Sequence, residues 1–191
     1  MARFQLLSLL VASFLLGGQQ SAAAPQAAPK LPAADVYAYI GGTTWATVGT
    51  EVAVYKWDKK KPSLTYVSSI KPGVEGPTFM AFSPNRQYLY TTDEEGPWAT
   101  ISSFHVRPDG NLMKLNDATS QQAAGVAHVG VSPDGKFVGA AAYGSGSVII
   151  YKVEKDGSLG KAVDTKQFGS DAKAHQVVFS KNGKRVYIPT L

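Results

Sequence analysis

The 191-residue sequence contains no cysteine, which excludes a disulfide scaffold, a cysteine nucleophile and a thiolate metal site. It also lacks the long apolar runs of a multispan membrane protein. Charged residues make up only 17%, and the basic ones are scattered apart from Lys59-Lys60-Lys61. The formal net charge of +5 therefore indicates solubility rather than a nucleic-acid-binding stripe. With 44% hydrophobic residues, the composition is that of a globular protein.

An apolar run over 6–16 follows the positively charged Arg3 and is too short to span a bilayer comfortably. Small residues after it complete the pattern of a secretory signal peptide over 1–23, cleaved after Ala23. This pattern predicts a secreted protein with no stable membrane span. An uncleaved membrane anchor is the alternative. The proline- and alanine-rich residues 24–35 predict a flexible leader.

Beyond the leader the sequence repeats itself with a period of about fifty residues. The repeat is clearest around Ser83, Ser132 and Ser180, which are spaced 49 and 48 residues apart. Each serine ends a predicted strand and opens a turn of the Ser-Pro-Asp-Gly type, and a second strand follows. Such turns recur because proline fixes φ, aspartate or asparagine accepts a local hydrogen bond, and glycine supplies a positive φ.

A second pair of strands follows each hairpin, as at 147–153 and beyond the turn at 155–158. Four strands in roughly 48 residues, without helical periodicity, are typical of a propeller blade. The sequence therefore predicts an all-β fold, a partial β-propeller of about three and a half four-stranded blades. A β-sandwich with coincidental turn similarity is the alternative. The predicted blades are 36–73, 76–124 and 125–169, followed by a half blade at 172–191.

So few blades cannot close a ring, since propellers ordinarily have four to eight. Their open ends would expose unpaired strand surface, which invites self-association. We therefore expect the sequence to be part of a longer gene product, or else to complete its ring by oligomerising.

Several stretches match the motifs of a known family. Residues 128–135 and then 141–148 match a His-x-x-x-x-Pro-Asp-Gly … Ala-Asn-Tyr-x-x-Gly-Ser-Val pattern with one substitution. Residues 76–84 and 88–94 match an Asn-Pro-Ser segment and a Leu-Tyr-x-x-Asn-Glu run. These stretches resemble the lactonase-type seven-bladed β-propeller family, which includes bacterial 6-phosphogluconolactonase and the fungal carboxymuconate cyclases. The resemblance extends over 36–191 and covers the N-terminal half of a family member.

The resemblance implies that the chain hydrolyses or forms a lactone of a sugar acid or a muconate-type acid, such as 6-phosphogluconolactone, without a cofactor. The ligand would bind to polar side chains around the central channel. Three positions depart from the family pattern, because Ala142 replaces an asparagine, Lys173 a histidine and Thr190 an aspartate. These changes favour the alternative, a secreted non-catalytic propeller that acts as a binding or surface-interaction protein.

Lactone hydrolysis needs a base that activates water and a cationic group that stabilises the developing oxyanion. Glu94, His128 and His175 are therefore the predicted catalytic residues. Alternatively, Glu94 is a solvated loop carboxylate, and each histidine is bonded to a neighbouring blade's carbonyl. Tyr143 is expected at the channel rim, and Lys173 is expected to attract a small anionic lactone or sugar acid. The sequence contains no metal-binding constellation, since its histidines lie far apart, and no Gly-x-Ser-x-Gly motif.

Overall fold

The computed structural model describes residues 35–43 and 49–191. The predicted signal peptide and the predicted leader up to residue 34 lie outside the described residues. Within those residues the chain forms antiparallel β-sheets, together with a single 3-10 turn, η1 (Ser170–Ala172). No helix in this part of the chain has the length and hydropathy needed to cross a membrane. The predicted all-β class is confirmed.

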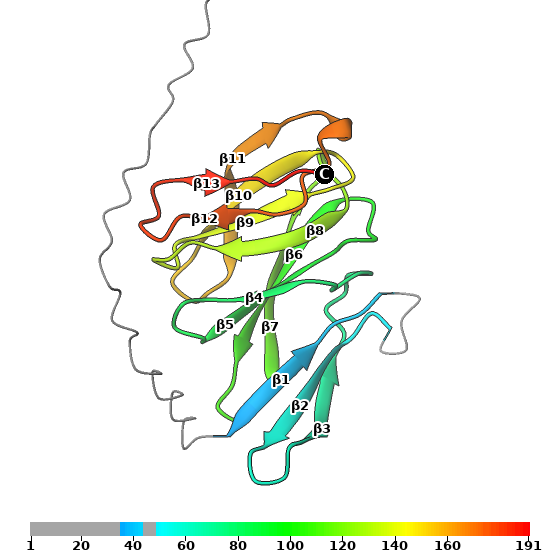
Figure 1. The fold of residues 1–191 in the computed structure, drawn as a ribbon, viewed down its shortest axis with the longest axis vertical. Helices are drawn as coiled ribbons and strands as arrows, with labels where there is room; N and C mark the ends of the chain where they lie inside the picture. The colour runs from blue at the N-terminus through cyan, green and yellow to red at the C-terminus, as the bar shows by residue number, and fades with distance from the viewer. Residues whose placement is uncertain (1–34, 44–48) are drawn as a thin grey trace, which may run out of the picture. The chain divides into compact units, whose positions relative to one another are not determined.

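Four sheets follow one another along the described chain (Figure 1). The first sheet consists of β1 (Val36–Ile40), β2 (Val52–Asp58) and β3 (Ser63–Ile70). The second consists of β4 (Met80–Phe82), β5 (Tyr88–Thr92), β6 (Ala99–Val106) and β7 (Leu112–Ser120). The third consists of β8 (Val126–Val131), β9 (Phe137–Ala142), β10 (Ser147–Val153) and β11 (Leu159–Gln167). The fourth is the hairpin of β12 (Val178–Phe179) and β13 (Val186–Tyr187).

Hydrogen bonds inside the serine turns explain the sequence repeat. Ser132 Oγ donates a hydrogen bond to Asp134 Oδ1 at 2.7 Å and accepts one from the Phe137 backbone N–H at 2.9 Å. The same two hydrogen bonds recur at Ser83 and at Ser180. Because each hydroxyl is satisfied within its own turn, the turn closes the hairpin without help from distant residues.

The first sheet differs from the prediction of a four-stranded blade, because it has three strands. By the register of the repeat, β1 corresponds to β5 and β9. The described chain therefore places no strand beside β1 at the position that β4 and β8 take in the next two sheets. The described part of the chain begins at Asp35, directly before β1, so it holds no preceding residues that could form this strand.

Tyrosines join each of the first two sheets to the sheet that follows. Tyr39 Oη donates a hydrogen bond to the Gly110 carbonyl oxygen at 2.8 Å, and Tyr90 Oη donates one to the Gly157 carbonyl oxygen at 3.1 Å. Both glycines have a positive φ, of 82° and 85°, and a Cβ atom there would lie within 2.3 Å of another tyrosine ring, that of Tyr37 at Gly110 and that of Tyr88 at Gly157. These two turns therefore require glycine, both for their backbone conformation and for the close approach of the ring.

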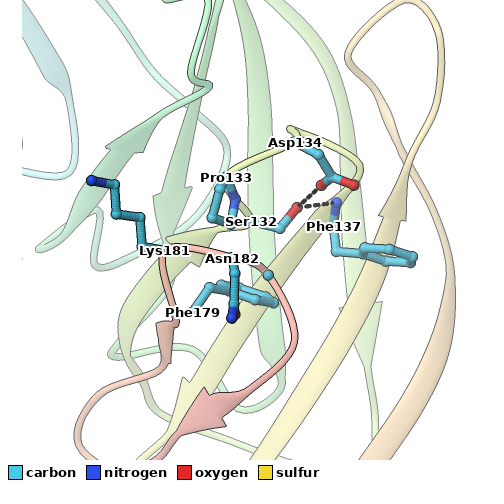
Figure 2. A pocket seen from close by; sticks show the side chains of 8 residues that line it. Ser132, Pro133, Asp134, Phe137, Phe179, Lys181 and Asn182 are labelled. Atoms are coloured by element: carbon cyan, nitrogen blue, oxygen red, sulfur yellow. Dashed lines mark hydrogen bonds between the residues drawn. The ribbon is translucent and has the colours of Figure 1, made fainter.

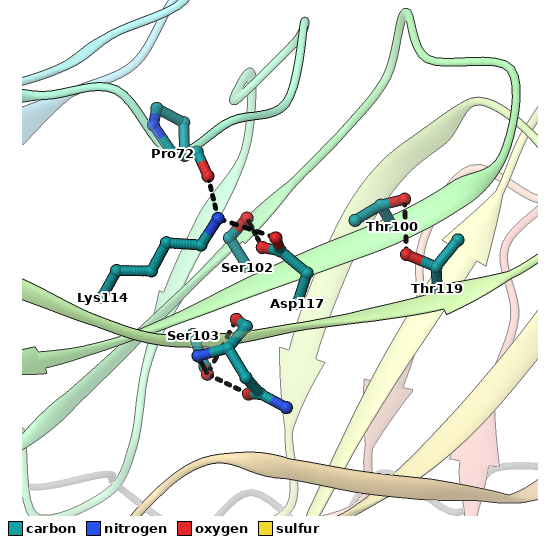
Figure 3. Close-up of polar contacts among 8 residues, drawn as sticks. Pro72, Thr100, Ser102, Ser103, Lys114, Asp117 and Thr119 are labelled. Atoms are coloured by element: carbon teal, nitrogen blue, oxygen red, sulfur yellow. Dashed lines mark hydrogen bonds and ion pairs between the residues drawn. The ribbon is translucent and has the colours of Figure 1, made fainter.

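Polar contacts at Lys114 also tie the second sheet to the segment that follows the first (Figure 3). The Lys114 ammonium on β7 donates to the Pro72 carbonyl oxygen and pairs with Asp117 Oδ2 at 2.7 Å. Ser102 donates to the other oxygen of that carboxylate at 2.7 Å. A cluster of buried apolar side chains spans the second and third sheets and packs them against each other.

Candidate functional site

The candidate site lies at the loops that follow β1, β5 and β9. A cavity of about 470 Å³ opens there, and its lining consists of Thr43, Glu94, Glu95, Gly125, Tyr143 and Gly144. Thr43, Glu94 and Tyr143 are 51 and 49 residues apart, which is one period of the repeat. Three consecutive sheets thus contribute one equivalent side chain each to a single cavity.

Glu94 is held by the segment that leads into the second sheet. Thr78 Oγ1 donates a hydrogen bond to Glu94 Oε2 at 2.5 Å, and the Glu94 backbone N–H donates to the Gly76 carbonyl oxygen at 3.0 Å. A hydroxyl that donates a hydrogen bond to a carboxylate fixes the orientation of that carboxylate. Since Glu94 is exposed, water can reach this oriented carboxylate.

Tyr143 links the cavity to a cationic side chain. Lys173 Nζ lies 5.1 Å from the centroid of the Tyr143 ring, and the His175 ring meets the same ring edge-on, with the centroids 5.9 Å apart. A cation within about 6 Å of an aromatic face is attracted by the ring quadrupole. Lys173 also has a positive φ of 48°, a conformation that residues other than glycine rarely adopt and that concentrates at functional sites.

His128 has a different environment on β8, where it is half-buried. Its Nδ1 accepts a hydrogen bond from the Val177 backbone N–H at 3.4 Å, and its ring lies against Phe79 with the centroids 4.2 Å apart. Burial, and to a lesser extent the nearby His175, lowers the pKa of His128 below its ordinary value of 6.5. The imidazole is therefore neutral at neutral pH. Its hydrogen-bond partner is the N–H group of Val177, directly before β12, and not the carbonyl that the alternative interpretation expected.

Ala142 lies in the protein interior and not on the surface of the cavity. Ala142 is fully buried, and the equivalent residue of the second sheet is Asp93, which is buried as well. Asp93 Oδ1 accepts three hydrogen bonds from backbone N–H groups, at 3.0 to 3.2 Å. In the third sheet Ser145 Oγ accepts the corresponding hydrogen bond from the Ala124 N–H at 3.3 Å. Compared with the asparagine of the family pattern, Ala142 lacks a side-chain oxygen that could accept hydrogen bonds from backbone N–H groups. Ser145 Oγ accepts one of these bonds instead.

The structure brings Glu94 and Tyr143 to one cavity and places Lys173 and His175 against the Tyr143 ring. His128, on β8, lies near His175 but does not line the cavity. Among the described residues that line the cavity, the charged side chains are carboxylates, so the cation beside it comes from Lys173. No group of three histidine, aspartate or glutamate side chains in 35–43 and 49–191 could hold a metal ion.

Two residues of the site were not predicted from the sequence. Thr43 lines the cavity, and Thr78 donates to Glu94. The period of the repeat could have identified Thr43, because it lies one period before Glu94. Thr78 lies in the motif at 76–84, but that motif does not indicate its contact with Glu94, which joins residues 16 positions apart.

Comparison with known proteins places this geometry in a family. The model of the family described as "Lactonase, 7-bladed beta-propeller" matches residues 37–191. Among curated proteins, the chain is similar to the 6-phosphogluconolactonase of Bacillus subtilis, with 28% identity over 125 residues. This match covers 63% of the chain but 35% of the B. subtilis protein, so the chain spans about a third of that relative's length.

Two solved structures share the fold. A Bacteroides fragilis protein proposed to be a 6-phosphogluconolactonase matches with a TM-score of 0.71 and 19% identity, over 85% of this chain and 47% of that one. The periplasmic gluconolactonase of Pseudomonas aeruginosa matches with a TM-score of 0.68 and 22% identity, over 82% of this chain and 47% of that one. The chain therefore belongs to the seven-bladed β-propeller lactonase family and spans about half the length of these structures.

Proposed function

We propose that the chain supplies part of a lactonase site that binds and hydrolyses an anionic sugar-acid lactone such as 6-phosphogluconolactone. The observation that carries this proposal is the Glu94 carboxylate, which Thr78 orients at a cavity that it shares with Tyr143. The ammonium of Lys173, against the Tyr143 ring, adds a positive charge beside that cavity. The names of the B. subtilis and P. aeruginosa relatives support the substrate class.

In this proposal Glu94 is the general base. It takes a proton from a water molecule while the water oxygen adds to the lactone carbonyl carbon. The bond from that carbon to the ring oxygen then breaks, and the ring oxygen receives the proton. One water is consumed, and the product is the open hydroxy acid. Lys173 attracts the phosphate or carboxylate of the ligand by its charge.

The direct test is the hydrolysis of 6-phosphogluconolactone by the purified chain, corrected for spontaneous hydrolysis. Glu94→Gln keeps the size of the side chain and removes the base, so the corrected rate should fall at least about 100-fold. Glu75→Gln is the matched control, because Glu75 is exposed in the segment before β4 and does not line the cavity. Equal corrected rates in the wild type and in Glu94→Gln would reject Glu94 as the base.

Lys173 also favours a second candidate function, the binding of an anionic sugar acid without turnover. The family pattern has a histidine at the position of Lys173. An ammonium there attracts an anion but is a poorer proton shuttle near neutral pH than an imidazole. Titration with 6-phosphogluconate, followed by its phosphorus NMR signal, separates the two functions. Binding without any corrected hydrolysis of the lactone would support the binding protein.

A further inference from the structure

The strands of each sheet have two ends, and the turns at one end gather basic residues. The turns between first and second strands and those between third and fourth strands lie at this end, because the strands are antiparallel neighbours. We name this surface the turn face, and it consists of segments 58–62, 83–87, 107–111, 132–136, 154–158 and 180–184. The loops that line the candidate cavity lie at the opposite ends of the strands.

The turns of successive sheets lie side by side. Pro84 of the second sheet lines one cavity together with Asp134 and Lys155 of the third. Pro133 of the third sheet lines another, of about 360 Å³, together with Lys181 of the fourth (Figure 2). The β4–β5, β8–β9 and β12–β13 turns are also seen on the same side, at the left of Figure 1. The turns of the second, third and fourth sheets therefore form one continuous part of the turn face.

Every described sheet supplies basic residues to the turn face. They are 59–61 in the first sheet, Arg86 and Arg107 in the second, Lys136 and Lys155 in the third, and Lys181 and Lys184 in the fourth. The acidic residues of the same segments are fewer, namely Asp58, Asp109, Asp134, Glu154 and Asp156. The loops at the opposite end reverse this balance, with Glu51, Glu75, 93–95 and Asp171 against Lys71 and Lys173.

The four aspartates of the turn face accept hydrogen bonds inside their own turns, and Glu154 pairs with Lys152 of β10 at 3.2 Å. Asp109 Oδ1 accepts the Asn111 backbone N–H at 3.0 Å, and Asp156 Oδ1 accepts the Ser158 hydroxyl at 2.6 Å. These hydrogen bonds lower the pKa of both carboxyl groups. By contrast, Arg86 is exposed and forms no ion pair in the described part of the chain. Arg107, Lys155, Lys181 and Lys184 are likewise exposed and without an ion pair there.

We infer that the turn face docks on the surface of a lipid bilayer that contains anionic lipids, with the candidate cavity on the side away from the membrane. The basic residues stand on the tips of turns in four successive sheets, which matches a broad charged surface better than the groove that a linear polyanion would follow. Exposed prolines at the tips, Pro84, Pro108 and Pro133, add apolar contacts at the lipid headgroups. Each basic residue near such a surface strengthens binding about fivefold at moderate salt.

The test is partition of the purified chain onto vesicles, with and without about 30 mol% phosphatidylglycerol in phosphatidylcholine. Binding should require phosphatidylglycerol and should weaken strongly at about 0.5 M salt. The double variant Lys155→Glu, Lys184→Glu should lower the phosphatidylglycerol-dependent partition coefficient at least tenfold. The matched control is Lys71→Glu, Lys166→Glu, which changes the net charge equally but lies off the turn face, and it should change partition less than about twofold.

Both variants retain the apolar run 6–16, so any contribution of that run to partition is the same in each. Equal thermal midpoints show that both are folded, and Lys155→Gln, Lys184→Gln gives a milder second variant. An equal decrease of the partition coefficient in the test and control variants would mean that net charge alone determines binding, and would overturn the inference. Absence of any phosphatidylglycerol dependence would overturn it as well, as would binding to soluble polyphosphate without binding to vesicles.

Discussion

The ammonium of Lys173 lies 5.1 Å from the centre of the Tyr143 ring, and that ring lines the cavity that also contains Glu94. Lys173→Met keeps most of the side-chain length and removes the charge. Affinity for 6-phosphogluconate should therefore fall about 5- to 20-fold, the range for one charge-assisted contact. Calorimetric titration measures the affinity, and Lys71→Met, at an exposed lysine without a contact to Tyr143, is the control. An unchanged affinity in Lys173→Met would show that Lys173 does not contribute to ligand binding.

Thr78 positions Glu94, because its hydroxyl donates to the Glu94 carboxylate at 2.5 Å. Thr78→Val keeps the shape of the side chain and removes the donor, so the carboxylate loses its fixed orientation. We expect kcat for lactone hydrolysis to fall about tenfold with little change in KM. Thr100→Val is the control, because Thr100 shares a hydrogen bond with Thr119 away from the cavity (Figure 3). The same decrease in both variants would point to a general loss of stability.

The lowered pKa of His128 makes folding stability depend on pH. Below its ordinary pKa of 6.5, the unfolded chain binds this proton more readily than the folded chain does. The contribution of His128 to the free energy of unfolding is therefore complete above pH 6.5, and it is lost as the pH falls toward the folded pKa. His128→Gln does not titrate, so it should lose less stability than the wild type between about pH 7 and 5. Urea denaturation at each pH measures this difference, and parallel profiles would contradict it.

The hairpins were predictable because their chemistry is local. Ser132 bonds to residues two and five positions away, so the sequence around it contains the whole turn. The three-stranded first sheet was not predictable in this way, because the strand missing beside β1 depends on residues that are distant or absent from the described chain. The same holds for the contact of Tyr90 with Gly157, which joins residues 67 positions apart.

The site was predicted only in part, for a similar reason. Glu94 and Tyr143 were found through motifs, but a motif does not reveal that the position of Ala142 is fully buried. The scattered basic residues indicated no patch in the sequence. An antiparallel sheet, however, brings every second turn to the same end, so Lys155 and Lys184 share one face although they lie far apart in the chain.

Gly157 offers a test of how the sheets are joined. Its φ of 85° disfavours any other residue, and a Cβ atom there would overlap the Tyr88 ring of the preceding sheet. Gly157→Ala should therefore lower the free energy of unfolding by about 3 kcal/mol or more, since backbone strain and steric overlap add.

Gly49→Ala is the matched control for this variant. Gly49 also has a positive φ, of 61°, but no heavy atom of the described residues lies within 4 Å of the place that a Cβ atom would take. Gly49→Ala should thus lower the free energy of unfolding by only about 1 kcal/mol, because only the backbone conformation is strained. Urea denaturation of both variants gives the two values. Equal losses would mean that the Tyr88 ring can move aside, and that the second and third sheets are not held together by this contact.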